Sequence, residues 1–244
     1  MRSACAWALP LVFPSFALFP AQAAEPGETT LHYAVEWRLI RAGSAKLSLP
    51  AEGRASIVLE SVGLVSKLYK VEDHYAATYE RGFCATTATM TSSEGKRRRE
   101  TKVTYDRARK KANYLERDLV KDAVVRVDEI DTPGCVHDII GALLQLRTMK
   151  VDVGHSAQIP MSDGKKSAMV RVEAQAHEDL KTPAGTFKTT RYEVFLFGGV
   201  LYHRPARVFV WLSDDPRHLP VQIRVRLQLT IGTITLVLEK EAHS

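Results

Sequence analysis

The sequence predicts a mainly β protein: one strongly curved antiparallel sheet or open barrel, with one amphipathic helix packed on its concave side. Two observations lead to this fold class. Most of the chain after residue 24 alternates apolar and polar residues with period two, which is typical of strands with one buried face. One segment breaks this alternation with helical periodicity, and a curved sheet is the large apolar face against which its stripe can be buried.

The first 23 residues have the three parts of a cleavable signal peptide. Met1-Arg2 supplies a positive charge, an apolar stretch runs from Ala4 to Phe19, and Ala21-Gln22-Ala23 is a small-residue cleavage site. In the mature chain, residues 24–244, no Pro/Ser/Gly-rich linker occurs and no apolar segment is long enough for a transmembrane helix. We therefore expect a periplasmic protein with a single curved antiparallel β domain over 24–244.

The first predicted strand lies within residues 31–40. Its expected core face carries Leu31, Tyr33, Val35, Trp37 and Leu39. Ala42-Gly43 marks the expected break before the next strand, and turn signals such as Arg81-Gly82 and Glu94-Gly95 separate later ones. Short strands at this spacing are typical of an antiparallel meander.

The helix is predicted over residues 135–150. Apolar residues recur there at i, i+3, i+4 and i+7, and Pro133-Gly134 precede the segment. His137 and Asp138 stand in the expected first turn, where the helix dipole stabilises a carboxylate. We interpret Asp138 as a capping residue and Arg147 as a snorkelling or sheet-paired side chain, in preference to a ligand site.

A polar stripe is predicted on one face of a strand near the C-terminus. Gln222, Arg224, Arg226 and Gln228 alternate there with apolar residues. Exposure to solvent is the simpler explanation of the stripe, and a functional groove is the alternative.

Cys84 and Cys135 are the cysteines that remain in the mature chain. Neither lies in a C-x-x-C motif, and a pair of cysteines in an oxidising compartment is typical of a disulfide. We predict that they are bonded, with Cα atoms within about 7 Å of each other. The bond would tie the start of the helix to a strand in the first half of the chain.

The formal net charge of the sequence is +6, a mild excess that does not identify a partner. Lys96-Arg97-Arg98-Arg99 is the one dense basic run, and Glu94-Gly95 beside it predicts the end of a hairpin. A nucleic-acid partner is not expected for an exported protein. The run is interpreted as solvated, and its contact with anionic lipid or glycan is left open.

No motif predicts catalysis, a metal site or a cofactor. The histidines lack the spacing of metal ligands, and the chain has no G-x-S-x-G nucleophile elbow. Glu72, Asp73 and His74 form the strongest acid/base candidate. In a strand, however, Asp73 would point away from the other two side chains, so the three would not converge.

The segment 213–218 also carries titratable side chains, namely Asp214, Asp215 and His218. Strand-like runs lie on both sides of it, and Asp and Pro are common in turns. We therefore predict a hairpin turn at this segment and not a catalytic centre.

Five segments, in this order, resemble a family of exported bacterial proteins, the domain-of-unknown-function family 3108. They are YAVEWRLIRAG, LYKVEDHY, HDIIGALLQLRTMKVDVG, TPAGTFKTTRYEV and VWLSDDPRHLPVQI. The resemblance covers nearly the whole mature chain and implies location and fold. The last segment is also similar, at Trp211, Asp214, Leu219 and Pro220, to an element of periplasmic lipoprotein carriers. Their strongly curved sheet partly wraps a helix around a lipid-accepting cavity.

Three functions fit these observations. The first is a non-catalytic periplasmic binding or carrier module for an apolar or amphipathic cell-envelope molecule, possible partners being a lipid or another envelope component. The second is an envelope structural or assembly factor that contacts protein or glycan. The third, a hydrolase, has the least support. An apolar cavity would favour the first, and a core filled by the helix would favour the second. The sequence does not identify ligand-binding residues.

Overall fold

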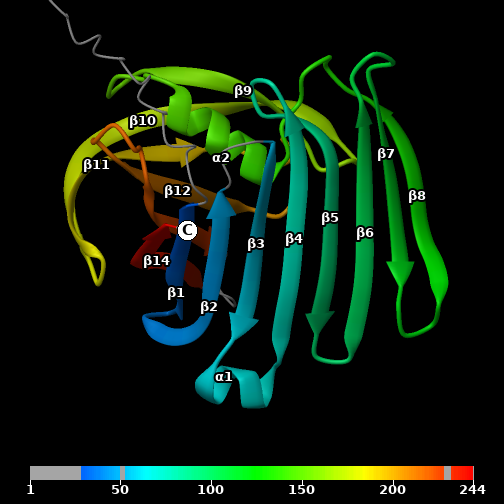
Figure 1. The fold of residues 1–244 in the computed structure, drawn as a ribbon, viewed down its shortest axis with the longest axis horizontal. Helices are drawn as coiled ribbons and strands as arrows, with labels where there is room; N and C mark the ends of the chain where they lie inside the picture. The colour runs from blue at the N-terminus through cyan, green and yellow to red at the C-terminus, as the bar shows by residue number, and fades with distance from the viewer. Residues whose placement is uncertain (1–28, 50–52, 228–231, 244) are drawn as a thin grey trace, which may run out of the picture.

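The computed structural model describes residues 29–49, 53–227 and 232–243, so the expected signal peptide lies outside the described residues. The described chain forms one 14-stranded sheet in the order β8-β7-β6-β5-β4-β3-β2-β1-β14-β13-β12-β11-β10-β9. Two meanders, β1 to β8 and β9 to β14, are joined where β1 pairs with β14. The sheet curls without closing into a barrel (Figure 1), which confirms the predicted fold class.

The first meander contains eight strands and a short helix. Its elements are β1 (Thr29–Trp37), β2 (Ile40–Leu49), β3 (Arg54–Ser61), α1 (Gly63–Leu68), β4 (Val71–Glu80), β5 (Cys84–Glu94), β6 (Arg97–Asp106), β7 (Lys111–Asp118) and β8 (Ala123–Asp131). The second helix and the second meander follow. Their elements are α2 (Ile139–Thr148), β9 (Ser156–Ser162), β10 (Ser167–Thr182), β11 (Gly185–Val194), β12 (Ala206–Ser213), β13 (Pro220–Leu227) and β14 (Thr233–His243).

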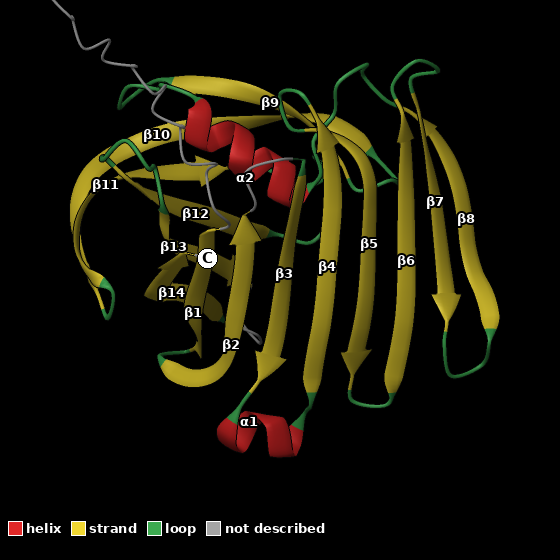
Figure 2. Cartoon of the chain, viewed as in Figure 1, coloured by secondary structure: helices red, strands yellow, loops and turns green. Residues whose placement is uncertain are grey.

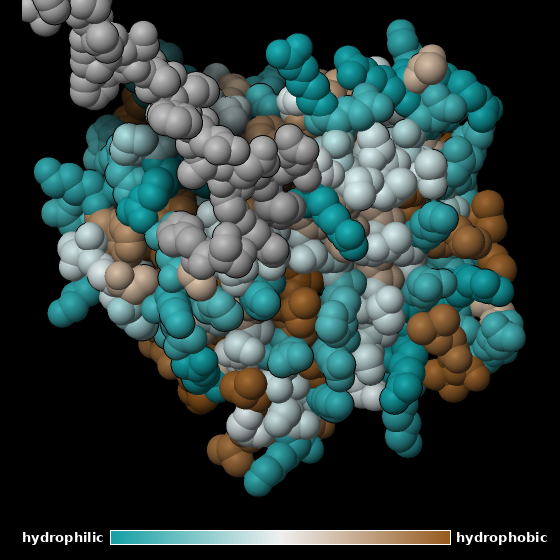
Figure 3. All heavy atoms as spheres, in the orientation of Figure 1, coloured by the Kyte–Doolittle hydropathy of each residue, from teal (hydrophilic) through white to brown (hydrophobic). Residues whose placement is uncertain are grey.

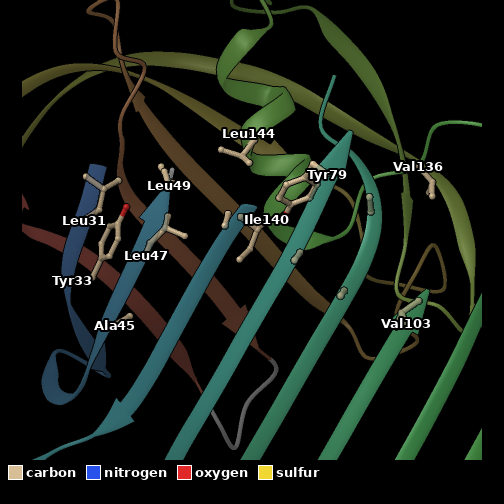
Figure 4. Packing of buried hydrophobic residues seen from close by; sticks show 14 of the residues in the cluster. Leu31, Tyr33, Ala45, Leu47, Leu49, Tyr79, Val103, Val136, Ile140 and Leu144 are labelled. Carbon is tan, nitrogen blue, oxygen red and sulfur yellow. The ribbon is translucent and has the colours of Figure 1, made fainter. Parts of the chain in front are cut away.

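Helix α2 lies inside the curl of the sheet (Figure 2). Ile140 and Leu144 pack in a core cluster with side chains of the first meander, as Figure 4 shows. Ala142 and Leu146 belong to a second cluster with side chains of β9 to β12. Because the helix buries side chains against both meanders, it holds the two halves of the curled sheet together.

The helix is shorter than the predicted range 135–150. It begins at Ile139, after the cap residue Asp138, and ends at Thr148. The residues before it pair with strands instead: the Val136 carbonyl accepts from the Ala85 amide at 2.8 Å, and the His137 amide donates to the Pro160 carbonyl at 2.9 Å. These long-range backbone hydrogen bonds override the local helical pattern.

The first hairpin also differs from the prediction. β1 and β2 are connected at Arg38 and Leu39, which both have positive φ angles, of 49° and 69°. Gly43 lies inside β2, where a Cβ atom would approach the Glu60 carbonyl oxygen to 2.4 Å. The glycine therefore permits close approach of β3 and does not form the turn. With the strand ending at Trp37, Trp37 and Leu39 are exposed and do not join the core.

Helix α1 was not predicted. It is a six-residue helix between β3 and β4, and it buries none of its residues. The Val62 amide before it donates to the Ala42 carbonyl at 2.9 Å. This contact attaches the helix to the end of β2.

The structure contains the predicted disulfide between Cys84 and Cys135, whose Cα atoms are 5.0 Å apart. Cys84 begins β5, and Cys135 lies four residues before α2. The bond therefore fixes the segment that leads into the helix to the first meander.

We expect the double variant Cys84→Ser/Cys135→Ser to lose about 4 kcal/mol of free energy of unfolding, because the bond closes a long chain loop in the unfolded state. Its sequence separation is 51 residues. Urea unfolding of the oxidised protein and the variant would measure the difference. A difference below about 1 kcal/mol would mean that α2 and the two core clusters hold the segment without the bond.

Candidate functional site

An apolar cavity of about 160 Å³ lies between α2 and the concave face of the sheet. Its lining comes from both meanders and from the helix. The residues of the sheet that line it are Tyr33, Leu47, Ile57, Ile159, Met161, Val172, Val194, Val208, Val210, Ile223 and Leu236. Ile57, Ile223 and Leu236 are only half-buried. The core beneath the helix is therefore not filled solid.

The helix contributes one face to this cavity. Ile139, Leu143 and Leu146 line it at positions i, i+4 and i+7, which share a face of an α-helix. Ile140 and Ala142 line it as well, and Ile140 also packs with Leu144 in the cluster of the first meander. The apolar stripe found in the sequence thus serves two purposes, packing and the lining of a cavity.

A second cavity, of about 280 Å³, adjoins the first and shares Ile139 and Met161 with it. Its walls come from β4 to β7, from the turn between β9 and β10, and from the loop between β11 and β12. Apolar and aromatic residues such as Met90, Val103 and Tyr105 line one part. Charged side chains line the other, so the two cavities together run from an apolar interior to a charged opening.

Arg97, Arg99 and Lys165 are the cations of this opening. Arg99 Nη2 lies 3.1 Å from an Asp118 carboxylate oxygen, and Arg97 Nη2 lies 3.6 Å from a Glu116 oxygen. Nε and Nη1 of Arg99 are buried and have no hydrogen-bond partner among the described residues. The basic run is therefore not uniformly solvated: its last arginine turns into the concave face.

Asp138 is the most deeply buried carboxylate beside the cavities, with 1% of its surface exposed. It caps α2 by accepting hydrogen bonds from the Gly141 and Ile140 amides at 2.9 and 3.4 Å. The Tyr75 hydroxyl donates to Oδ2, the oxygen that also accepts from Ile140, at 2.5 Å. Burial and the nearby carboxylate raise the pKa of Tyr75 far above its usual value. The group is a structural cap, as the sequence suggested, and the phenol stays protonated.

The acid/base candidate in β4 does not converge. Asp73 is buried and accepts a hydrogen bond from the Ser93 amide at 3.2 Å. Glu72 and His74 lie on the other face of the strand, 3.7 Å apart, and a hydrogen bond from Lys70 lowers the pKa of Glu72. The predicted division of the three side chains between two faces is confirmed.

Residues 214–219 connect β12 to β13, so the predicted hairpin connection at 213–218 is present with its bounds shifted by one residue. The turn is fastened to the helix, because Arg147 Nε donates to the His218 carbonyl at 3.0 Å and the His218 ring is 2.7 Å from the Arg147 carbonyl. Asp215 accepts from the Arg217 amide at 2.9 Å. Asp214 accepts from the Thr190 hydroxyl at 2.7 Å. Both carboxylates are therefore engaged in contacts that hold the turn.

Trp211 lies on the outer face of the sheet and does not line either cavity. Its indole N–H donates to Glu178 at 2.8 Å, and the Arg224 guanidinium lies 5.0 Å from its ring. Arg226 lies 5.2 Å from the ring of Phe209 in the same manner. The arginines of the polar stripe therefore cover aromatic side chains. Gln228 lies outside the described residues.

The described residues contain no group of three or more His, Cys, Asp and Glu side chains placed to hold a metal ion. No helix in the same part of the chain is long and apolar enough to cross a membrane.

Comparison with known families gives a match to the model described as protein of unknown function, DUF3108, over residues 32–239. The chain belongs to this family. No curated protein matches the chain.

Three solved structures are similar to the DUF3108 chain. A β-barrel-like protein of the family DUF1849 from Brucella abortus has a TM-score of 0.58 at 8% identity, covering 91% of this chain and 100% of that one. A DUF1089 family protein from Pseudomonas aeruginosa has a TM-score of 0.39 at 12% identity, with 87% and 95% covered. A protein described as exported, with a YmcC-like fold, from Bacteroides fragilis has a TM-score of 0.27 at 9% identity, with 92% and 98% covered. The first of these supports the fold alone.

His137, next to the cap residue, gives the fold a pH dependence. Its ring nitrogen Nδ1 is 2.8 Å from the Phe83 carbonyl. Burial lowers the pKa of His137, while the Phe83 carbonyl and Asp138 act in the opposite direction. The imidazolium is thus less stable in the folded chain than in the unfolded one.

We expect the free energy of unfolding to fall as the pH drops below about 6.5, the pKa of an unfolded histidine, toward the lower folded pKa. Above that pH the group contributes no pH dependence. In His137→Asn the amide can replace Nδ1 as the donor but cannot titrate, so stability should fall less between pH 7.5 and 5.0 than in the unaltered protein. Urea unfolding at both pH values measures this, and an equal fall in the two proteins would contradict it.

Proposed function

We propose that this DUF3108 protein is a non-catalytic binding or carrier module of the periplasm, for an apolar or amphipathic molecule of the cell envelope. The observation that supports this function is the apolar cavity under α2 and the charged cavity beside it, which shares Ile139 and Met161 with it. An amphipathic molecule needs both environments, an apolar one for its hydrocarbon and a polar one for its head group.

The lining explains why a ligand would bind there. Leu143, Ile223 and Leu236 are half-buried apolar side chains that line the cavity. Covering apolar surface contributes roughly 25 cal/mol for each Å² removed from water. Each cavity is smaller than the usual ligand pocket of about 300–1,000 Å³. A ligand that extends through both would therefore be held better than one confined to either.

Polar groups around the cavities support binding over catalysis. The Asp138 carboxylate accepts hydrogen bonds from the first turn of α2 and from the Tyr75 hydroxyl. The Glu116 carboxylate accepts a hydrogen bond from the Tyr114 hydroxyl at 2.9 Å. Carboxylates with these hydrogen bonds hold neighbouring groups in place and are poorly placed to accept a proton from a substrate.

A structural or assembly role in the envelope is the second candidate. Strand β8 is an edge of the sheet, and Val124, Val125 and Val127 on it are exposed. An exposed apolar edge strand is suited to the addition of a strand from another protein. Cross-linking in periplasm would detect such a partner, whereas a co-purified lipid would favour the carrier.

The substitution Leu143→Trp should occupy the apolar cavity and weaken the binding of 1-aminoanthracene, a small apolar fluorophore, at least tenfold. Met169→Trp, at an exposed position of β10, is the matched control and should bind like the unaltered protein. Fluorescence titration measures both, and native mass spectrometry of protein purified from periplasm without detergent identifies the natural ligand. Equal binding by all three proteins, or no bound molecule and no fluorophore binding, would reject the proposal.

A further inference from the structure

Four connections lie along one end of the first meander. They are the β1–β2 turn, the α1 connection between β3 and β4, the β5–β6 turn and the β7–β8 turn. Because neighbouring strands are antiparallel, alternate connections of a meander fall at the same end of the sheet. Figure 1 shows three of them, those at α1, β5–β6 and β7–β8, in a row along the lower edge. We call these four connections the lower rim.

The lower rim carries large apolar side chains in solvent. Leu39 is 91% exposed, Leu68 87%, Leu64 77% and Val120 63%. Trp37, Ile40, Tyr69 and Leu119 are exposed beside them. Apolar surface is visible in Figure 3 around α1, between hydrophilic side chains. Single exposed leucines are ordinary, but most of the large exposed apolar residues of the described chain are gathered here.

The turn at Leu39 adds a second observation. Two-residue hairpin turns with positive φ at both positions favour Asn and Gly, because other side chains are strained there. In this chain Arg38 and Leu39 occupy them, with φ angles of 49° and 69°. A strained leucine that is almost fully exposed contributes little to folding, and such outliers are commoner at functional positions.

Cations are interleaved with these apolar side chains and outnumber the carboxylates of the lower rim. The four connections and the two strand residues on either side of each carry the cations Arg38, Arg41, Lys67, Lys70, Lys96, Arg97, Arg98, Arg117 and Lys121, and the carboxylates Glu36, Glu60, Glu72, Glu94, Asp118 and Asp122. Lys70 lies 3.2 Å from Glu72, and Arg97 lies 3.6 Å from Glu116. Asp118 is engaged by the Val120 and Lys121 amides at 2.9 and 3.1 Å. The basic run found in the sequence is thus one part of a wider positive surface.

Backbone hydrogen bonds join adjacent connections of the lower rim. The Gly95 amide donates to the Lys70 carbonyl at 2.8 Å, and the Leu119 amide donates to the Arg98 carbonyl at 3.0 Å. The Val62 amide donates to Ala42 in β2 at 2.9 Å, and the Arg38 amide in the β1–β2 turn donates to Thr233 in β14 at 3.0 Å. The apolar and basic side chains therefore project from a prearranged edge.

We infer that the lower rim docks on the surface of an anionic phospholipid bilayer. Interleaved leucine, tryptophan and basic side chains match the boundary between head groups and acyl chains, where apolar groups insert and cations meet lipid phosphates. A protein groove would need one contiguous apolar face, whereas these side chains are spread along an edge and separated by charges. Arg97 and Arg99, at the opening of the larger cavity, belong to the same end of β6, so docking would bring that opening to the lipid.

The mature chain should co-sediment with vesicles of phosphatidylglycerol and phosphatidylcholine, and bind weakly to phosphatidylcholine alone. Raising the salt concentration should release it, because exposed charges are screened.

Lys96→Gln/Arg98→Gln should lower the partition coefficient about fivefold for each cation removed, and Leu39→Ser/Leu68→Ser should lower it at least tenfold. Phospholipid could also enter the cavities, so Leu143→Trp, which fills the apolar cavity, is sedimented in parallel. It should bind the vesicles like the unaltered protein, which separates docking of the lower rim from the proposed carrier function.

Two double variants serve as matched controls. Arg109→Gln/Lys110→Gln removes two cations from the β6–β7 turn at the opposite end of the sheet, and Val153→Ser/Met169→Ser removes exposed apolar side chains elsewhere. Both should bind like the unaltered protein, with circular dichroism confirming that all variants are folded.

Equal binding to the two kinds of vesicle, or equal losses in the control variants, would overturn the inference. So would a vesicle-free dimer that Leu39→Ser/Leu68→Ser abolishes, because the lower rim would then contact a second copy.

Discussion

The buried carboxylate of Asp138 connects the helix inside the sheet to the strands around it. One oxygen accepts from the Gly141 amide, and the other accepts from the Tyr75 hydroxyl on β4. A buried carboxylate is stable only when donors surround it, so the helix end and the strand must meet at this position. The placement of α2 then determines which side chains pack against each meander, and where a cavity is left.

Close approach at the start of the helix depends on a missing side chain. A Cβ atom on Gly141 would lie 2.7 Å from an Asp138 oxygen and 2.8 Å from the Tyr79 ring. The glycine brings one side of the helix against β4, and Ala142 follows on the side of the second meander. Ile139 and Leu143, which are only partly buried, line the apolar cavity between these two contacts.

Local patterns predicted the strands, the helix and the disulfide, because alternation, helical periodicity and cysteine pairing are properties of short segments or of composition. They failed where contacts between segments distant in sequence determine the conformation of a residue. Val136 and His137 look helical but bond to β5 and β9, and Arg99 looks solvated but turns into the concave face. Local patterns could not predict the cavity, because residues as far apart in sequence as Tyr33 and Ile223 line it together.

The two edge strands of the sheet, β8 and β9, are not hydrogen-bonded to each other. Near this seam, an isolated bridge joins His137 to Met161, through backbone bonds of 2.9 Å to Pro160 and from Ser162. In a closed barrel, strand number and stagger fix the radius. The open curl lacks that constraint, and the packing of α2 against both meanders sets the width of its interior instead. The width of the interior thus depends on side-chain volume along one helix and not on the number of strands.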